Sequence, residues 1–132
     1  MWFRDKKTEN PADHFFCPMI DARRMEVYSA IFDSDLNLIR ETQAEIIDEN
    51  SFVDLLNSKK VVFAGDGAEK CEGVFGENSN AIFITDLQTS SQFLAPLSEK
   101  EFQQKNFEDV AYFEPFYLKD FVAGIPRVKG LK

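Results

Sequence analysis

The chain has 132 residues, of which 44% are hydrophobic and 29% are charged. This length and composition fit one ordinary globular domain and exclude an intrinsically disordered chain. The formal net charge of -8 repels phosphate backbones, so we do not expect a protein that reads nucleic acid directly. No apolar run is long enough to cross a bilayer and no signal peptide is visible, so we expect a cytoplasmic protein.

The aromatic and sulfur-containing residues indicate what fills the core. The 14 Phe residues predict a core dominated by aromatic packing, with some rings left to face a partner. Cys17 and Cys71 are the two cysteines, and in a reducing compartment we expect both to be buried as small apolar side chains. His14, the one histidine, opens an apolar segment, so we expect it to be structural.

Strand patterns fill the first part of the chain. Residues 1–13 are polar, and we expect a mobile leader there. Residues 14–22 form an apolar run of strand length, in which Pro18 should delay the pairing or cause a bulge. Residues 25–33 and 38–47 have strand patterns as well. Tight turns between the three strands predict an antiparallel meander.

The hydrophobic period changes after the third strand. Residues 48–57 place apolar side chains at helical spacing, with Asn50 or Ser51 as the N-cap. Two more strands and two more helical segments follow, and Pro96 leaves open whether the last segment is one helix or two. The strands are predicted at residues 61–64 and 81–86, and the helical segments at 68–75 and 90–104.

The order of these segments predicts the fold class. A three-stranded meander followed by strand-helix-strand crossovers gives an α/β domain, with a mixed five-stranded sheet and helices on its faces. By analogy this is the ribonuclease H-like arrangement, the half-unit of the actin-like ATPase fold. We expect one such domain at residues 14–121, followed by a flexible basic tail at residues 122–132.

Three segments of the sequence are similar to motifs of one protein family. They are IDARRMEVY at residues 20–28, GDG at residues 65–67 and EPFYLK at residues 114–119. In this order they resemble the TsaB (YeaZ) family of tRNA threonylcarbamoyladenosine biosynthesis proteins. Met25 stands where many members have glycine, and Lys119 stands where arginine is usual. The positions that match the motifs are Asp21, Ala22, Arg23, Glu26, Val27, Tyr28, Gly65, Asp66, Gly67, Glu114, Pro115, Tyr117 and Leu118.

The resemblance implies a non-catalytic role in tRNA modification. Proteins of this family support the catalytic partner TsaD, together with the ATPase TsaE, in attaching threonylcarbamate to the adenosine beside the anticodon. The family's amino-terminal lobe makes the main contact with TsaD, and this sequence resembles the carboxy-terminal lobe alone. Absence of the first lobe would uncover apolar surface, so we expect an exposed apolar patch or a homodimer.

Other chemistries find little support in the residues. The family is also labelled glycoprotease-like, but a zinc peptidase needs about three protein ligands and the sequence has one histidine. The GDG turn lacks the Lys-Ser/Thr of a P-loop, so we expect no nucleotide binding. We therefore expect no catalytic residue, no metal and no cofactor.

The alternative function is a metal-dependent, ribonuclease H-like nuclease. Carboxylates at adjacent strand ends hold two metal ions in such enzymes. Asp21 and Asp66 are the candidate ligands, with Glu26 and Asp86 as possible additions. Against this alternative stand the acidic surface and the suitability of Asp66 for shaping a turn.

The aromatic segment at residues 110–118 has two interpretations. Pro115 forces Glu114 toward an extended conformation. Because burying one Phe contributes about 1.5–3 kcal/mol, we expect the segment to pack along the domain as a clasp. The alternative is a strip that binds a partner.

Overall fold

The structure, a computed structural model, describes residues 10–119. The strands are β1 (His14–Asp21), β2 (Glu26–Phe32), β3 (Leu38–Ile46), β4 (Lys60–Ala64) and β5 (Ala81–Ile84). The helices are α2 (Val53–Ser58), α3 (Glu69–Phe75) and α4 (Ala95–Gln103), with 3-10 helices at Pro11–Asp13 and Ser91–Leu94. The expectations of a mobile leader and a flexible basic tail fall mainly on residues 1–9 and 120–132, which lie outside the described residues.

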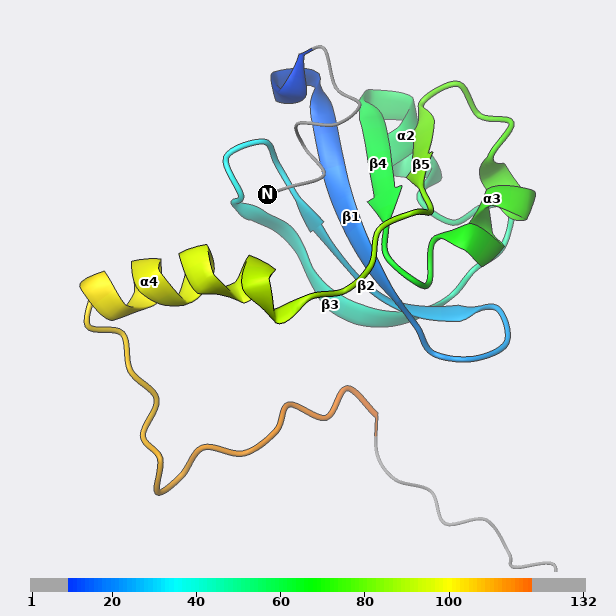
Figure 1. The fold of residues 1–132 in the computed structure, drawn as a ribbon. Helices are drawn as coiled ribbons and strands as arrows, with labels where there is room; N and C mark the ends of the chain where they lie inside the picture. The colour runs from blue at the N-terminus through cyan, green and yellow to red at the C-terminus, as the bar shows by residue number, and fades with distance from the viewer. Residues whose placement is uncertain (1–9, 120–132) are drawn as a thin grey trace, which may run out of the picture.

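One sheet organises the domain (Figure 1), and its strand order is β3-β2-β1-β4-β5. The pairs β1–β2 and β2–β3 are antiparallel. The pairs β1–β4 and β4–β5 are parallel. The predicted α/β class and the mixed five-stranded, ribonuclease H-like sheet are therefore confirmed.

Pro18 lies within β1 and does not interrupt it. Phe16 pairs with Phe32 and Met19 pairs with Ser29, so both strands advance by the same number of residues across the proline. On the other side of β1, Pro18 itself is in register with β4. The expectation that pairing starts after the proline or needs a bulge is wrong, because one missing donor leaves the neighbouring ladder bonds intact.

Helix α2 begins later than the sequence pattern predicted. Phe52 is its N-cap residue and has a left-handed φ of 62°, so neither Asn50 nor Ser51 caps the helix. The Ser51 hydroxyl instead accepts a hydrogen bond from the Asp48 N–H at 2.9 Å. The buried ring of Phe52 packs edge-on against Phe63 at 5.3 Å, and this packing decides where the helix starts.

The main core lies between the sheet and helices α2 and α3. Phe63 is fully buried at its centre, with ring contacts to Phe52, Phe75 and Phe83. Aromatic packing therefore dominates the core, as predicted. Cys17 and Cys71 are both free and buried, and burial raises the pKa of each thiol. Their predicted role as small core side chains is confirmed.

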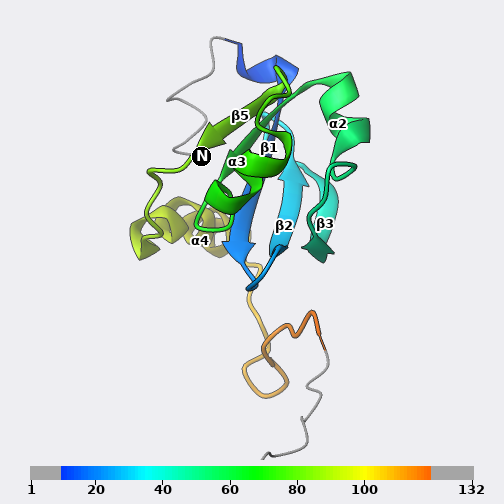
Figure 2. The same cartoon turned by 90° about the vertical axis from the view of Figure 1, so that its right-hand side faces the viewer.

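The opposite side of the sheet faces α4, as Figure 2 shows, where α2 and α4 lie on opposite sides. A smaller cluster of Phe16, Val62, Ala64 and Ile84 is buried on this side. Helix α4 itself buries no residue. The 3-10 helix Ser91–Leu94 leads into α4, so the segment contains one α-helix and its proline lies in the first turn.

The aromatic segment after α4 does not pack on the domain. Lys105 takes a left-handed φ of 57° directly after the helix, and the chain then leads away from the sheet (Figure 1). Val110 is 94% exposed and Phe116 is 82% exposed. The predicted clasp at residues 110–118 is therefore wrong, because the helix before it is not seated on the sheet and cannot direct the segment onto it.

None of the helices in the described part of the chain is long and apolar enough to cross a membrane.

A pair of valine substitutions measures what the core contributes. Val61 is fully buried in β4 and Val110 is 94% exposed. We expect Val61→Ala to lower the free energy of unfolding by about 2 kcal/mol, because it removes two buried carbons and leaves a cavity. The control Val110→Ala should change the free energy of unfolding by less than about 0.5 kcal/mol. Equal effects in urea denaturation would contradict this placement of the core.

Candidate functional site

The first motif and the glycine turn meet at one end of the sheet. The segment IDARRMEVY forms the end of β1, a hairpin and the start of β2, while the glycine turn follows β4. Because β1 and β4 are parallel neighbours, their carboxyl ends lie at the same edge. We call this region the hairpin end of the sheet.

Gly65 and Gly67 allow the turn to press against the backbone of β1. Gly65 has φ +113°, and a Cβ on it would lie 2.2 Å from the Met19 carbonyl oxygen. A Cβ on Gly67 would lie 3.0 Å from the carbonyl carbon of Ile20. The Gly67 N–H donates to the Met19 carbonyl at 3.3 Å. The sequence therefore needs glycine here for close contact between two strand ends.

Asp66 joins the glycine turn to the first motif. Its carboxylate accepts a hydrogen bond from the Asp21 N–H at 3.1 Å. The two candidate metal ligands, Asp21 and Asp66, are therefore neighbours at the ends of adjacent strands. Asp66 binds a backbone donor, and this contact fixes the turn against the strand.

Lys70, in the first turn of α3, holds the hairpin closed. Its ammonium donates to the Asp21 carboxylate. It also donates to the backbone carbonyls of Arg24 at 2.8 Å and Glu26 at 2.6 Å. Three acceptors use all three of its N–H groups. Sequence reasoning missed this residue. A lysine in the first turn of a helix is unfavourable because the N-terminal end of the helix dipole is positive, so its presence there is a sign that acceptors outside the helix bind its ammonium group.

The hairpin between β1 and β2 turns without glycine. Arg23 and Arg24 both have left-handed φ values, 71° and 49°. Such backbone costs about 1–2 kcal/mol per residue and persists only where other contacts hold it. The Arg23 N–H donates to the Asp21 carboxylate at 2.9 Å, and Lys70 binds the Arg24 carbonyl. Both arginine side chains are exposed.

The neighbours of Asp21 lower the pKa of its carboxyl group. The Lys70 ammonium and then the Arg23 N–H hold the pKa of Asp21 below its usual range. Since the folded pKa is lowered, the contribution of Asp21 to stability is present above the unfolded pKa and is lost as the pH falls through the folded pKa.

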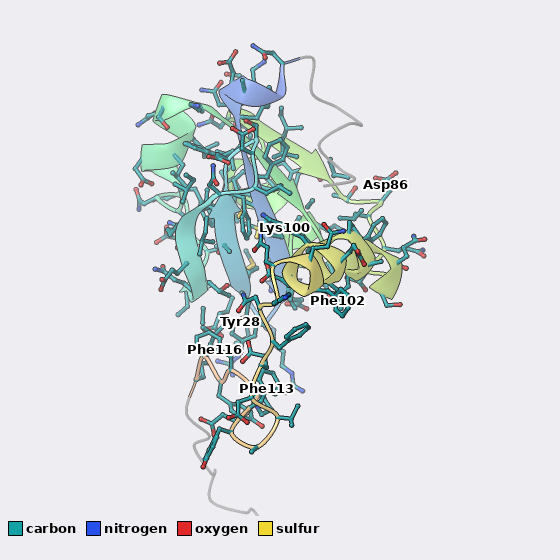
Figure 3. The ribbon with its side chains drawn as sticks, turned by 90° about the vertical axis from the view of Figure 1, so that its left-hand side faces the viewer. Tyr28, Asp86, Lys100, Phe102, Phe113 and Phe116 are labelled. Atoms are coloured by element: carbon teal, nitrogen blue, oxygen red, sulfur yellow. The ribbon has the colours of Figure 1, made fainter. Side chains whose placement is uncertain are left out.

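The candidate metal ligands are engaged by groups of the protein itself. Asp21 pairs with Lys70, and the Glu26 carboxylate pairs with Lys119. Asp86 lies away from Tyr28 and the hairpin (Figure 3), in a separate hollow with Gln88 and Phe93. Across residues 10–119, no group of three or more His, Cys, Asp or Glu side chains could hold a metal ion. The geometry gives the nuclease alternative no support.

The closing motif reaches the hairpin end only through its last residue. The ion pair of Lys119 with Glu26 connects EPFYLK to the first motif. Leu118 is half-buried, whereas Glu114, Pro115 and Tyr117 are exposed. Within the first motif, Val27 is buried in the core while Tyr28 is half-buried on the opposite side of the sheet.

A hollow of about 610 Å³ lies beside the hairpin, between the two arginines, Ile46 and Lys119. The chain's one histidine is at the other end of β1, and His14 is buried with a hydrogen bond from Nδ1 to the Asn10 carbonyl at 2.7 Å. This position agrees with the structural role predicted for it. The hairpin end therefore combines exposed cations with a surface hollow.

Comparison with known proteins finds a likeness of fold. No protein-family model matches the sequence, and no curated protein matches it. The fold is similar to the crystal structure of an uncharacterized protein from Pseudomonas aeruginosa, which is described as having similarity to the peptidase YEAZ. The TM-score is 0.64 at 18% sequence identity, and the likeness covers 84% of this chain and 51% of that chain. This chain thus shares its fold with about half of a YEAZ-like protein.

Alanine substitutions at Gly65 and Gly73 should have opposite effects on stability, because a Cβ would clash at Gly65 and meet open space at Gly73. We expect Gly65→Ala to lower the free energy of unfolding by about 3 kcal/mol or more, because the new methyl group meets a β1 carbonyl in strained backbone. Gly73 lies in α3 with open space around it, so Gly73→Ala should raise stability by about 0.5–1 kcal/mol. Chemical denaturation measures both changes, and a neutral Gly65→Ala would refute the close contact.

The loss of stability caused by removing the Lys70 ammonium should depend on pH. We expect Lys70→Met to lower the melting temperature at pH 7, because the Asp21 carboxylate and two carbonyls lose their donor. As the pH falls through the lowered pKa of folded Asp21, the carboxylate becomes protonated, so the difference from the wild type should narrow. Lys100→Met on exposed α4 is the control and should have little effect at either pH. A pH-independent difference would exclude a role for the Asp21 charge.

Proposed function

We propose that this chain is a non-catalytic interaction domain of the tRNA threonylcarbamoyladenosine machinery, and that it supports the catalytic partner TsaD. The observation that carries the proposal is the convergence of the first motif, the glycine turn and Lys119 at one end of the sheet. The likeness of fold to a protein with similarity to YEAZ supports the same assignment.

A role through protein contact suits the charge and the geometry. The net charge of -8 disfavours direct binding of tRNA, so the domain would act on the modification through its partner. The exposed Arg23 and Arg24 are held in fixed backbone positions by Lys70 and Asp21. Exposed cations in fixed positions can attract an acidic patch on a partner protein and fix the orientation in which the two proteins bind. We place the contact with TsaD at this hairpin, and TsaE would join the same assembly.

Peptidase activity is not part of the proposal. The buried thiols of Cys17 and Cys71 have raised pKa values and so do not supply a thiolate nucleophile. The buried His14 lies at the end of β1 opposite to Asp21. These positions bring no nucleophile and base together.

Binding to purified TsaD tests the proposal. We expect the wild-type chain to bind TsaD in a pull-down and by calorimetry, and to raise threonylcarbamoyladenosine formation in a reconstituted reaction. Arg23→Glu/Arg24→Glu should weaken binding by roughly tenfold or more, because it reverses two charges in the contact.

The control reverses two charges elsewhere. Lys59 and Lys60 are exposed and precede the core of β4, at the end of the sheet opposite to the hairpin. Lys59→Glu/Lys60→Glu changes the net charge equally, so it should leave TsaD binding near the wild-type level. Equal loss in both variants would indicate a general charge effect, and no binding by the wild-type chain would defeat the proposal.

A further inference from the structure

A polar hollow lies at the end of the sheet opposite to the hairpin. The 3-10 helix Pro11–Asp13 and helix α2 lie at this end, where β1 and β4 begin (Figure 1). The hollow has a volume of about 660 Å³, which is within the range of roughly 300–1,000 Å³ for small-molecule sites. None of the residues that line it belongs to the three motifs. We call it the amino-end hollow.

Hydrogen bonds between separate elements hold the walls of the amino-end hollow. The Lys59 ammonium donates to the Ala12 carbonyl at 3.1 Å, which joins the residue after α2 to the 3-10 helix. The Asn80 side-chain amide donates to the Leu56 carbonyl at 2.8 Å, which joins the residue before β5 to α2. The walls therefore have a fixed shape without a ligand, and this lowers the entropic cost of binding one.

His14 is a polar side chain that is almost completely buried in the wall of the hollow. It is 5% exposed, and its Nδ1 lies 2.7 Å from the Asn10 carbonyl oxygen. A carbonyl oxygen can only accept, so Nδ1 carries the proton and donates it. In the neutral ring Nε2 is then an acceptor, and no group within residues 10–119 donates to it. A ligand with a hydroxyl group can supply the missing donor.

Lys60 places a cation beside His14. The two residues are in register on β1 and β4, so their side chains point to the same face of the sheet. Lys60 is exposed, and its ammonium makes no hydrogen bond or ion pair with the residues that the structure describes. Lys59 adds a second positive charge, whereas Asp13 is the one carboxylate in the lining and accepts from the Asn10 amide at 2.6 Å. The hollow is therefore locally positive in a chain of net charge -8.

The remaining lining combines an apolar surface with hydrogen-bonding groups. Ile82 is in register with Val62, two residues after Lys60, so it lies on the same face as Lys60. The Ser58 hydroxyl donates to the Leu55 carbonyl at 2.8 Å, and its oxygen can still accept from a ligand. An apolar surface with a few converging polar groups is typical of sites for small molecules.

We propose that the amino-end hollow binds a small molecule that carries an oxyanion, either phosphate or carboxylate, together with a hydroxyl group. The oxyanion binds the Lys60 ammonium through a charge-assisted hydrogen bond. The hydroxyl group donates to Nε2 of His14, and Ile82 contacts the carbon atoms of the ligand. This inference does not depend on the proposed partnership with TsaD, which uses the other end of the sheet.

NMR titration of the nitrogen-15-labelled full chain tests the site. Glycerol phosphate and lactate each carry both groups, and the His14 ring signals are unambiguous because the chain has one histidine. We expect at least one of the two to change the His14 Nε2 and Lys60 amide signals saturably, with a dissociation constant of about 1 mM. A response to glycerol phosphate alone would identify phosphate esters, and a response to lactate alone would identify hydroxy acids. Methyl phosphate and acetate lack the hydroxyl group and should bind more weakly than their hydroxylated counterparts.

Substitutions of Lys60 test the role of its charge. Lys60→Met should weaken binding by roughly tenfold or more, because it removes the cation and keeps a side chain of similar shape. Lys60→Arg keeps the charge and should retain most of the binding. The matched control Lys100→Met removes an exposed lysine from α4 and should bind like the wild type. Amide spectra show whether each variant is folded.

Three results would overturn the proposal. They are no saturable change with either ligand up to roughly 20 mM, equal binding by Lys60→Met and the wild type, and the same response to sodium chloride at equal ionic strength. Binding to TsaD separates this inference from the proposed function. Lys59→Glu/Lys60→Glu should lose the ligand and keep TsaD, whereas Arg23→Glu/Arg24→Glu should keep the ligand and lose TsaD.

Discussion

The contact between the glycine turn and the end of β1 is the constraint on which the hairpin end depends. A methyl group at Gly65 would overlap the Met19 carbonyl, so the backbone of the turn lies closer to the backbone of β1 than a side chain would permit. That contact places Asp66 on the Asp21 N–H and starts α3 where Lys70 can reach across the hairpin. The arrangement of the exposed arginines follows from these bonds, and so does the recognition surface that we assign to them.

The sheet could be predicted from the sequence because its signals are local and agree with one another. Alternating or continuous apolar runs identified all five strands, and their order with the helices restricted the topology. The pairing of Asp21 with Asp66 was also predictable, since parallel neighbouring strands end at the same edge. The start of α2 was not predictable, because the burial of the Phe52 ring overrides the nearby capping residues.

Long-range contacts account for the rest of what the sequence left open. Lys70 binds groups 44 to 49 residues earlier in the chain, and no local pattern encodes that distance. The aromatic segment misled for a different reason. The aromatic composition of the segment predicts burial of Phe113 and Phe116, which are exposed in the structure. Composition alone cannot distinguish burial within the chain from burial against another chain. Of the motif residues, Asp21, Glu26 and Asp66 meet at the hairpin end, whereas Lys70, which joins Asp21 to Glu26, was missed.

The reach of Lys70 also sets an order of events when the chain folds. The hairpin residues Arg23 and Arg24 sit in backbone conformations that they disfavour alone, and the groups that stabilise them include a side chain more than forty residues downstream. Closing a loop of that length carries an entropic cost that only later contacts repay. During synthesis, β1 and β2 emerge from the ribosome well before α3, so the contacts of Lys70 with their connecting turn can form only after that helix has been made.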